Sequence, residues 1–156
     1  QQSAVTWEDI GWIREIWDGP IVIKGVHTVH DAIRASDEGA AAIIISNHGG
    51  RQLDRVLPTL EMLRRIAPHM KDRETEVLVD GGIRSGGDVA IALATGAKAI
   101  LLGRAYAFGL GAAGGAGVTK TLEIIRAEFE HTMRQLGCAR LEDLNESHVT
   151  EYHAAS

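Results

Sequence analysis

Short, almost fully apolar runs alternate along this chain with longer segments in which apolar residues recur every three or four positions. The apolar runs predict parallel strands at residues 21–26, 41–46, 76–79 and 99–102, and the first run has the pattern of a strand covered on both faces. The segments with helical periodicity occupy residues 7–17, 28–38, 58–66, 85–95, 118–136 and 141–145. A glycine-rich stretch at residues 109–117 precedes the long helix. The pattern therefore predicts four strand–helix units and further helices at the carboxyl end.

An internal repeat decides between the sheet architectures that alternating strands and helices allow. Residues 31–46 align without gaps on residues 88–103, and Asp, Ala, a Gly-Ala pair and Ile recur at one constant offset. The offset spans two strand–helix units, which indicates a repeated pair of units rather than a doubly wound sheet with a switch point. Parallel strands joined by right-handed crossovers in this order favour a barrel.

The chain is short for a closed barrel. A complete (β/α)8 barrel, the TIM barrel, typically needs roughly 250 residues, whereas this chain has 156 residues and half the required units. Four parallel strands alone leave two unpaired edges and an apolar inner face in contact with water. We therefore expect another polypeptide, or a second copy of the chain, to complete the sheet.

Composition and charge narrow the class of protein only slightly. Hydrophobic residues make up 45% and charged residues 24% of the chain, as in ordinary globular domains. The formal net charge of -5 gives no overall attraction to nucleic acid, so any bound anion needs a local cationic cluster. Cys138 is the single cysteine, which excludes an internal disulfide and a thiolate metal site. Because the chain opens on Gln1 rather than Met, we expect its natural amino terminus to lie upstream.

Polar and basic residues stand at the carboxyl ends of all four predicted strands. These ends are Lys24-Gly25, residues 46–51, residues 80–84 and Gly103-Arg104. In TIM barrels the working residues lie at this rim, and the last two strand–helix loops often hold a phosphate.

The last two strand ends have the features of a phosphate site. Gly81 and Gly82 let the backbone approach an anion closely, and Ser85 begins a helix whose free N–H groups favour negative charge. Arg84 and Arg104 can each direct two donors at phosphate oxygens. The alternative is that these are ordinary glycine turns with solvated arginines.

Three residues at the first two strand ends are candidates for catalysis or for binding an anionic group. Lys24 interrupts an apolar strand, and it either meets an anion or extends its ammonium group to water. His48 follows a strand end, where an imidazole can act as general acid or base, with a structural role as the alternative. Arg51 suits a substrate carboxylate, or else forms a loop ion pair with Asp54.

Three other patterns carry less weight. His27 and His30 lack a third ligand, so we expect no metal site there. The glycines at residues 111–117 do not directly follow a strand and lack a Lys-Ser/Thr ending, which makes them a poor phosphate loop. Three tryptophans are expected in the core or in an interface: Trp7, Trp12 and Trp17.

These motifs together resemble one known family. The chain carries IKGV at residues 23–26, SNHGGRQLD at 46–54, VDGGIRSGGDV at 79–89 and LGR at 102–104. The string at 46–54 is highly specific, whereas DGGIR occurs more loosely in several flavin barrels. The chain resembles the FMN-dependent α-hydroxy acid oxidases and dehydrogenases, which include glycolate oxidase, lactate oxidases and dehydrogenases, and mandelate dehydrogenase.

The resemblance implies FMN as the cofactor and a small (S)-2-hydroxy acid, of the lactate, glycolate or mandelate type, as the substrate oxidised to a 2-oxo acid. It implies that His48 takes a proton from the substrate and that Arg51 pairs with the substrate carboxylate. It also implies cofactor contacts at the flavin ring, the ribityl chain and the phosphate from Lys24, Ser46, Asp80, Gly81, Gly82, Arg84, Gly103 and Arg104.

The resemblance further places residues 1–156 in the C-terminal half of a TIM-barrel domain. In the family the first four strands supply more flavin contacts, aromatic hydroxyls and a second carboxylate-binding arginine, and this chain has none of these. We therefore expect an N-terminal half, either as a missing segment or as a second polypeptide, and little turnover without it.

Further expectations come from the family as well. They are a homo-oligomer, commonly a tetramer, no nucleic-acid partner, and a cytoplasmic location with peripheral membrane association in some members. Two alternatives remain: a non-catalytic half-barrel that binds phosphate or a partner chain, and an FMN or phosphate barrel that acts on a sugar phosphate.

Overall fold

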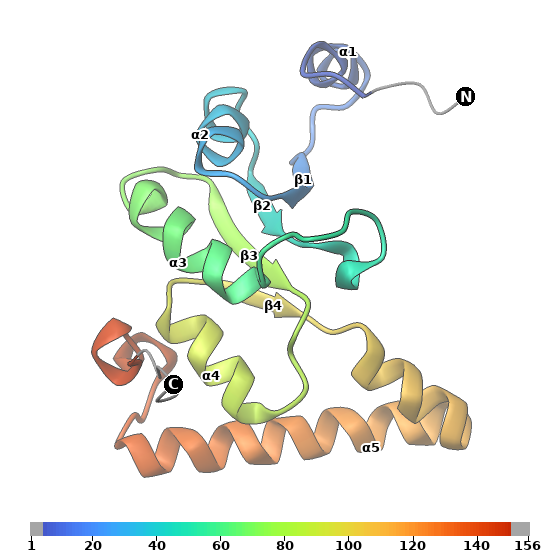
Figure 1. Cartoon of the computed structure of the whole chain (residues 1–156), viewed down its shortest axis with the longest axis vertical. Coiled ribbons are helices and arrows are strands. Elements are labelled where there is room, and N and C mark those ends of the chain that lie inside the picture. The colour runs from blue at the N-terminus through green and yellow to red at the C-terminus, as the bar shows by residue number, and fades with distance from the viewer. Residues whose placement is uncertain (1–4, 151–156) are drawn as a thin grey trace.

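A computed structural model describes residues 5–150 of the chain. Its sheet contains four parallel strands, namely β1 (Val22–Val26), β2 (Ala42–Ile45), β3 (Glu76–Asp80) and β4 (Ala99–Leu101). Each strand pairs with the next one in sequence, so the order is β1-β2-β3-β4 and the sheet has no switch point (Figure 1). The prediction of consecutive parallel strand–helix units is confirmed.

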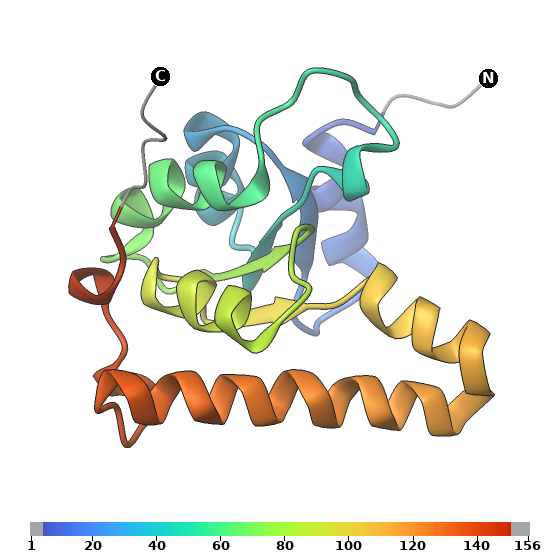
Figure 2. The same cartoon turned by 60° about the horizontal axis from the view of Figure 1, so that its bottom comes forward.

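Helices cover this sheet and extend beyond it. Within the described residues they are α1 (Glu8–Ile16), α2 (Val29–Asp37), α3 (Thr59–Met70), α4 (Gly86–Ala94) and α5 (Arg104–Leu136), with short 3-10 helices η1 (His48–Gly50), η2 (Leu141–Asp143) and η3 (Glu146–His148). Figure 1 shows α2, α3 and α4 on one side of the sheet, and Figure 2 shows α5 extending along α4. No helix in the described part of the chain is both long and apolar enough to cross a membrane.

The core lies between the sheet and these helices. Ile43 and Ile45 of β2 and Val77 and Val79 of β3 are buried, and they pack with Leu63 of α3. Because successive strand side chains point to opposite faces, the residues between them belong to the other face of the sheet. That face ends in the polar residues of the candidate site.

Helix caps explain the internal repeat. The Thr28 hydroxyl accepts a hydrogen bond from the backbone N–H of Asp31 at 3.0 Å, where α2 begins. The Ser85 hydroxyl accepts from the backbone N–H of Asp88 at 3.2 Å, where α4 begins. Each helix is followed by a glycine in the left-handed region, at φ 77° for Gly39 and 112° for Gly96. The repeat therefore encodes two equivalent helix starts and stops.

Two helix boundaries differ from the expectation. The long helix α5 begins at Arg104 rather than near residue 118, and the glycine-rich stretch is helical except at Ala113 and Gly114. Helix α3 continues to Met70, beyond the expected end at residue 66, with Pro68 inside it. In α3 the burial of Ala67 and Met70, on either side of Pro68, offsets the low helix propensity of proline.

The kink in α5 brings its two helical segments into backbone contact. A Cβ atom on Gly117 would overlap the carbonyl group of Gly109, and one on Gly109 would overlap the carbonyl oxygen of Gly117 and the hydroxyl of Thr121. Glycine is therefore needed at this crossing because no side chain fits between the segments. The glycine-rich stretch has a packing role in this fold.

Gly117→Ala should lower the free energy of unfolding by about 1–3 kcal/mol, because the added methyl group forces the two segments apart. Gly111 lies in the same helix but has no atom within 4 Å of an added Cβ. Gly111→Ala should therefore leave stability unchanged or raise it by up to about 1 kcal/mol. Urea unfolding followed by circular dichroism measures both, and equal destabilisation would contradict the proposed crossing.

The sheet edges carry exposed apolar groups. Strands β1 and β4 each pair with a single neighbour in the described structure, and Val22 of β1 is 49% exposed. Trp12 and Ile16, on one face of α1, are also exposed, whereas Trp7 packs against the core beneath the guanidinium group of Arg34. Such edges invite pairing with further strands, and completion of the sheet by another polypeptide stays a prediction.

Candidate active site

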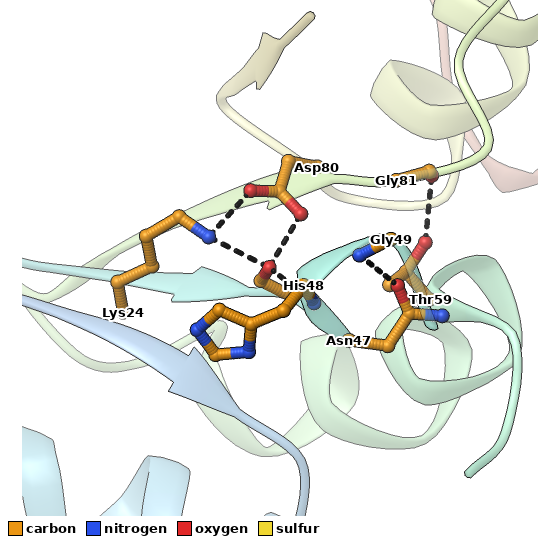
Figure 3. A network of polar contacts seen from close by, with 8 residues as sticks. Lys24, Asn47, His48, Gly49, Thr59, Asp80 and Gly81 are labelled. Carbon is orange, nitrogen blue, oxygen red and sulfur yellow. Dashed lines mark hydrogen bonds and ion pairs between the residues drawn. The ribbon is translucent and has the colours of Figure 1, made fainter. Parts of the chain in front are cut away.

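Three polar side chains from neighbouring strands meet at the carboxyl end of the sheet (Figure 3). The Lys24 ammonium group on β1 lies 2.6 Å from Asp80 Oδ2 on β3, and it donates a hydrogen bond to Ser46 Oγ at 2.7 Å. Ser46 directly follows β2 and donates to Asp80 Oδ1 at 2.5 Å. The three residues form a closed triangle that ties together the ends of three strands.

The Ser46 hydroxyl is fully buried and fully hydrogen-bonded. It also accepts a hydrogen bond from the backbone N–H of His48 at 3.1 Å. A hydroxyl has one proton to donate and two lone pairs, and Asp80, Lys24 and His48 use all three. Ser46 therefore positions its neighbours, and its predicted contact with the flavin stays a prediction.

His48 stands in a tight turn that the neighbouring residues fix. Its φ is 53°, and the Asn47 side chain accepts a hydrogen bond from the backbone N–H of Gly49 at 3.0 Å. Gly49 continues the turn with φ 69°. Gly25 of β1 leaves room for the imidazole, because a Cβ there would lie 2.9 Å from His48 Cε1. The ring therefore packs over the backbone of β1, beside Lys24.

A cavity of about 970 Å³ opens at this rim of the sheet. Nine of the ten site residues predicted from the sequence line it, namely Lys24, His48, Arg51, Asp80, Gly81, Gly82, Arg84, Gly103 and Arg104. The tenth, Ser46, is buried and hydrogen-bonded to residues of the wall. Parallel strands end at the same edge of a sheet, and this geometry brings residues from four distant segments around one space.

The cavity is cationic although the chain as a whole is anionic. Its wall carries one lysine and three arginines against a single aspartate, Asp80, which is already paired with Lys24. The formal net charge of the chain is -5. Guanidinium groups bind carboxylate and phosphate through paired hydrogen bonds, so this wall suits an anionic ligand.

The Gly81-Gly82 turn offers backbone rather than side chains to the cavity. Both residues have positive φ, 84° and 82°, a conformation that favours glycine. A Cβ on Gly82 would meet no atom within 4 Å, whereas one on Gly81 would lie 3.0 Å from Asn47 Oδ1 and 3.3 Å from Thr59 Cγ2. Gly81 packs against Asn47 and Thr59 on one side, and Gly82 leaves the backbone open to an approaching anion.

Sequence reasoning missed two residues that support the site. Asn47 belongs to the motif at residues 46–54 but has no predicted role, and Thr59 lies outside the motifs. The Thr59 hydroxyl is buried and donates to the carbonyl oxygen of Gly81 at 2.8 Å. Thr59 and Gly81 are far apart in the sequence, so no local pattern could have revealed the contact. The position of Thr59 directly after Pro58, at a helix start, was the available signal.

Other candidates lie away from this cavity. His30 Nδ1 is 3.6 Å from Asp31 Oδ1 at the start of α2. Within residues 5–150, no group of three or more His, Cys, Asp or Glu side chains is placed to hold a metal ion. A second cavity of about 680 Å³ lies at the amino ends of β3 and β4, and none of the predicted site residues line it.

Comparison with known proteins identifies the family. A sequence profile of the FMN-dependent dehydrogenases matches residues 1–151. The pre-mycofactocin synthase of Mycobacterium tuberculosis (strain CDC 1551 / Oshkosh) is 47% identical over 144 residues, which cover 92% of this chain and 36% of that protein. The L-lactate dehydrogenase of Caulobacter vibrioides (strain NA1000 / CB15N) is 48% identical over 148 residues, which cover 95% of this chain and 38% of that protein.

Solved structures agree with this match. A mandelate oxidase with benzoyl-formic acid superposes with a TM-score of 0.87 at 46% identity, over 91% of this chain and 42% of that chain. The chain belongs to the FMN-dependent dehydrogenase family, and its four strand–helix units form part of a TIM barrel. It spans less than half the length of the curated relatives that it matches.

Gly25→Ala should displace the His48 imidazole, because the added methyl group would lie 2.9 Å from the ring. Gly82→Ala is the matched control, since Gly82 has a similar positive φ but no atom within 4 Å of an added Cβ. The imidazole NMR resonances of His48 should move in the first variant and keep their positions in the second. Unmoved resonances in Gly25→Ala would show that the ring does not pack on this glycine.

Proposed function

We propose that this chain supplies the flavin- and substrate-binding part of an FMN-dependent oxidoreductase that converts a small (S)-2-hydroxy acid to the 2-oxo acid. One observation carries the proposal. Lys24, His48 and Arg51, from the first two strand ends, line the same cavity as Arg84 and Arg104 from the last two. A cofactor with a phosphate tail and a substrate with a carboxylate need cationic groups at two places in one cavity.

The phosphate end of FMN fits the last two strand ends. Gly82 leaves the backbone open, and Arg84 and Arg104 line the cavity there together with Gly81 and Gly103. Open glycine backbone and guanidinium groups are the donors that bind a phosphate at this position of a TIM barrel. These five residues are the proposed phosphate contacts.

The ring and ribityl end of FMN fits the Lys24–Ser46–Asp80 triangle. Lys24 is held at the cavity wall by Ser46 and Asp80, so its positive charge is fixed where an electron-rich ring would be stabilised. Asp80 is the proposed partner of the ribityl hydroxyls, and the fully buried Ser46 is proposed to act on the flavin through its hydrogen bonds to Lys24 and Asp80. FMN, when bound, accepts the two electrons that leave the substrate.

The substrate end of the cavity is proposed to lie between His48 and Arg51. Arg51 pairs with the substrate carboxylate and so orients the hydroxyl-bearing carbon. His48 takes one of the two protons that leave the substrate, as a general base, and the bound flavin would take up the other together with the two electrons. Two contacts fix the position of the imidazole. The backbone N–H of His48 donates a hydrogen bond to Ser46, and the ring packs on Gly25.

Completion of the barrel is part of the proposal. The chain covers 38% of the Caulobacter vibrioides lactate dehydrogenase, and its β1 and β4 edges each have one neighbour among the described strands. We propose that residues 1–156 form the C-terminal half, that an N-terminal half supplies the remaining four units, and that the completed protein assembles as a homo-oligomer. The side-chain pocket of the substrate belongs largely to that other half.

Flavin spectroscopy tests the proposed activity. The purified protein, with any companion polypeptide retained, should show flavin absorbance that a small (S)-2-hydroxy acid bleaches under anaerobic conditions. A chimaera in which this chain replaces the matching 38% of the Caulobacter vibrioides enzyme supplies the missing units if no companion is present. Absence of flavin binding in both would overturn the proposal and favour a non-catalytic half-barrel.

Arg51→Lys should raise KM for the hydroxy acid about tenfold, because one hydrogen bond of the guanidinium fork to the carboxylate is lost. The flavin spectrum should not change. Arg65→Lys is the control, since Arg65 pairs with Glu61 on the exposed face of α3. Steady-state kinetics give both values, and an unchanged KM in Arg51→Lys would remove Arg51 from the substrate site.

A further inference from the structure

Thr59 lies on the α3 side of the glycine turn, where it lines a smaller cavity of about 280 Å³ together with Gly81, Gly82 and Arg104. The residue is 4% exposed at the first position of α3, and its hydroxyl donates to the carbonyl oxygen of Gly81 at 2.8 Å (Figure 3). Thr59 is absent from the residues that line the large cavity, whereas Gly81 and Gly82 line it. The hydroxyl therefore binds the glycine turn on the side that faces α3.

The hydrogen bond from Thr59 fixes the orientation of the backbone N–H of Gly82. The peptide bond between Gly81 and Gly82 is trans and planar, so the N–H of Gly82 points opposite to the carbonyl of Gly81. Because Thr59 holds the carbonyl toward α3, the N–H of Gly82 is directed away from α3 and from the smaller cavity on that side, and Gly82 also lines the large cavity. Without the hydroxyl, two glycines with positive φ leave this peptide free to rotate.

We propose that Thr59 is a positioning residue for the anion-binding turn, and that it acts by orienting the Gly81–Gly82 peptide toward the phosphate of the cofactor. The inference rests on the proposed function, because it assumes that a phosphate binds at this turn. In this proposal Thr59 acts through that peptide and does not itself contact the cofactor. It fixes the N–H of Gly82 before the cofactor phosphate binds, which lowers the conformational entropy lost on binding.

Asn47 supports the same turn from a second direction. Its side-chain oxygen lies 3.0 Å from the position of a Cβ on Gly81, and Thr59 Cγ2 lies 3.3 Å from it. The two side chains enclose Gly81, but of the two only Thr59 has a hydrogen bond to that peptide among the described contacts. Removing the hydroxyl while keeping the shape of the side chain therefore isolates the orienting effect.

The test compares FMN with riboflavin, which lacks only the phosphate. Thr59→Val should weaken FMN binding about tenfold and leave riboflavin binding unchanged, and Thr59→Ser, which keeps the hydroxyl, should restore FMN binding. Titrations by flavin fluorescence are made on the purified protein with any companion retained and on the chimaera described above. Thr75→Val is the matched control, because Thr75 is also buried and donates to a carbonyl, that of Ala40 at 2.9 Å, but lies before β3 at the opposite end of that strand.

The outcomes distinguish failure of the positioning role of Thr59 from failure of the proposed function. Equal weakening of FMN and riboflavin, or no weakening of either, would overturn the positioning role of Thr59 while leaving the proposed function intact. A wild-type protein that binds neither flavin would overturn the proposed function itself, and this inference with it. If Thr59→Val does not fold by circular dichroism, Thr59→Ala removes the hydroxyl without adding bulk, and the same ratio of affinities decides.

Discussion

The contact among Lys24, Ser46 and Asp80 is the constraint on which the rest of the site depends. It joins the carboxyl ends of β1, β2 and β3 through a hydroxyl whose hydrogen-bonding capacity is completely used. The third bond of that hydroxyl, from the backbone of His48, links the ammonium group on one strand to the imidazole in the next loop. A buried serine thus couples the proposed cofactor residues to the proposed base.

Two turns with different supports line the cavity around this triangle. The turn that contains His48 is stabilised by the Asn47 side chain, and Gly25 leaves room for the imidazole. The glycine turn after β3 is stabilised by the hydroxyl of Thr59. The chain carries a formal net charge of -5, so attraction of an anion depends on these local groups rather than on bulk charge.

The sequence predicted the strands and their working ends well, for a physical reason. Apolar runs such as 41–46 are short, rich in β-branched residues and bounded by glycine and polar residues, which favours a buried strand, and parallel pairing then brings their ends together. The start of α5 and the role of Thr59 were not predictable in this way. The first depends on the contact of Gly109 with Gly117 across the kink in α5, and the second on a hydrogen bond between residues 22 positions apart. Local propensity carries no information about such contacts.

The most direct measurement is a crystal structure of the protein, or of the completed barrel, grown with FMN. The cavity at the carboxyl ends of the four strands should hold the cofactor, with its phosphate against Gly82, Arg84 and Arg104 and its ring beside Lys24. Electron density for FMN elsewhere on the molecule, or the phosphate at any place other than the loops after β3 and β4, would contradict a shared site built from these four strand ends.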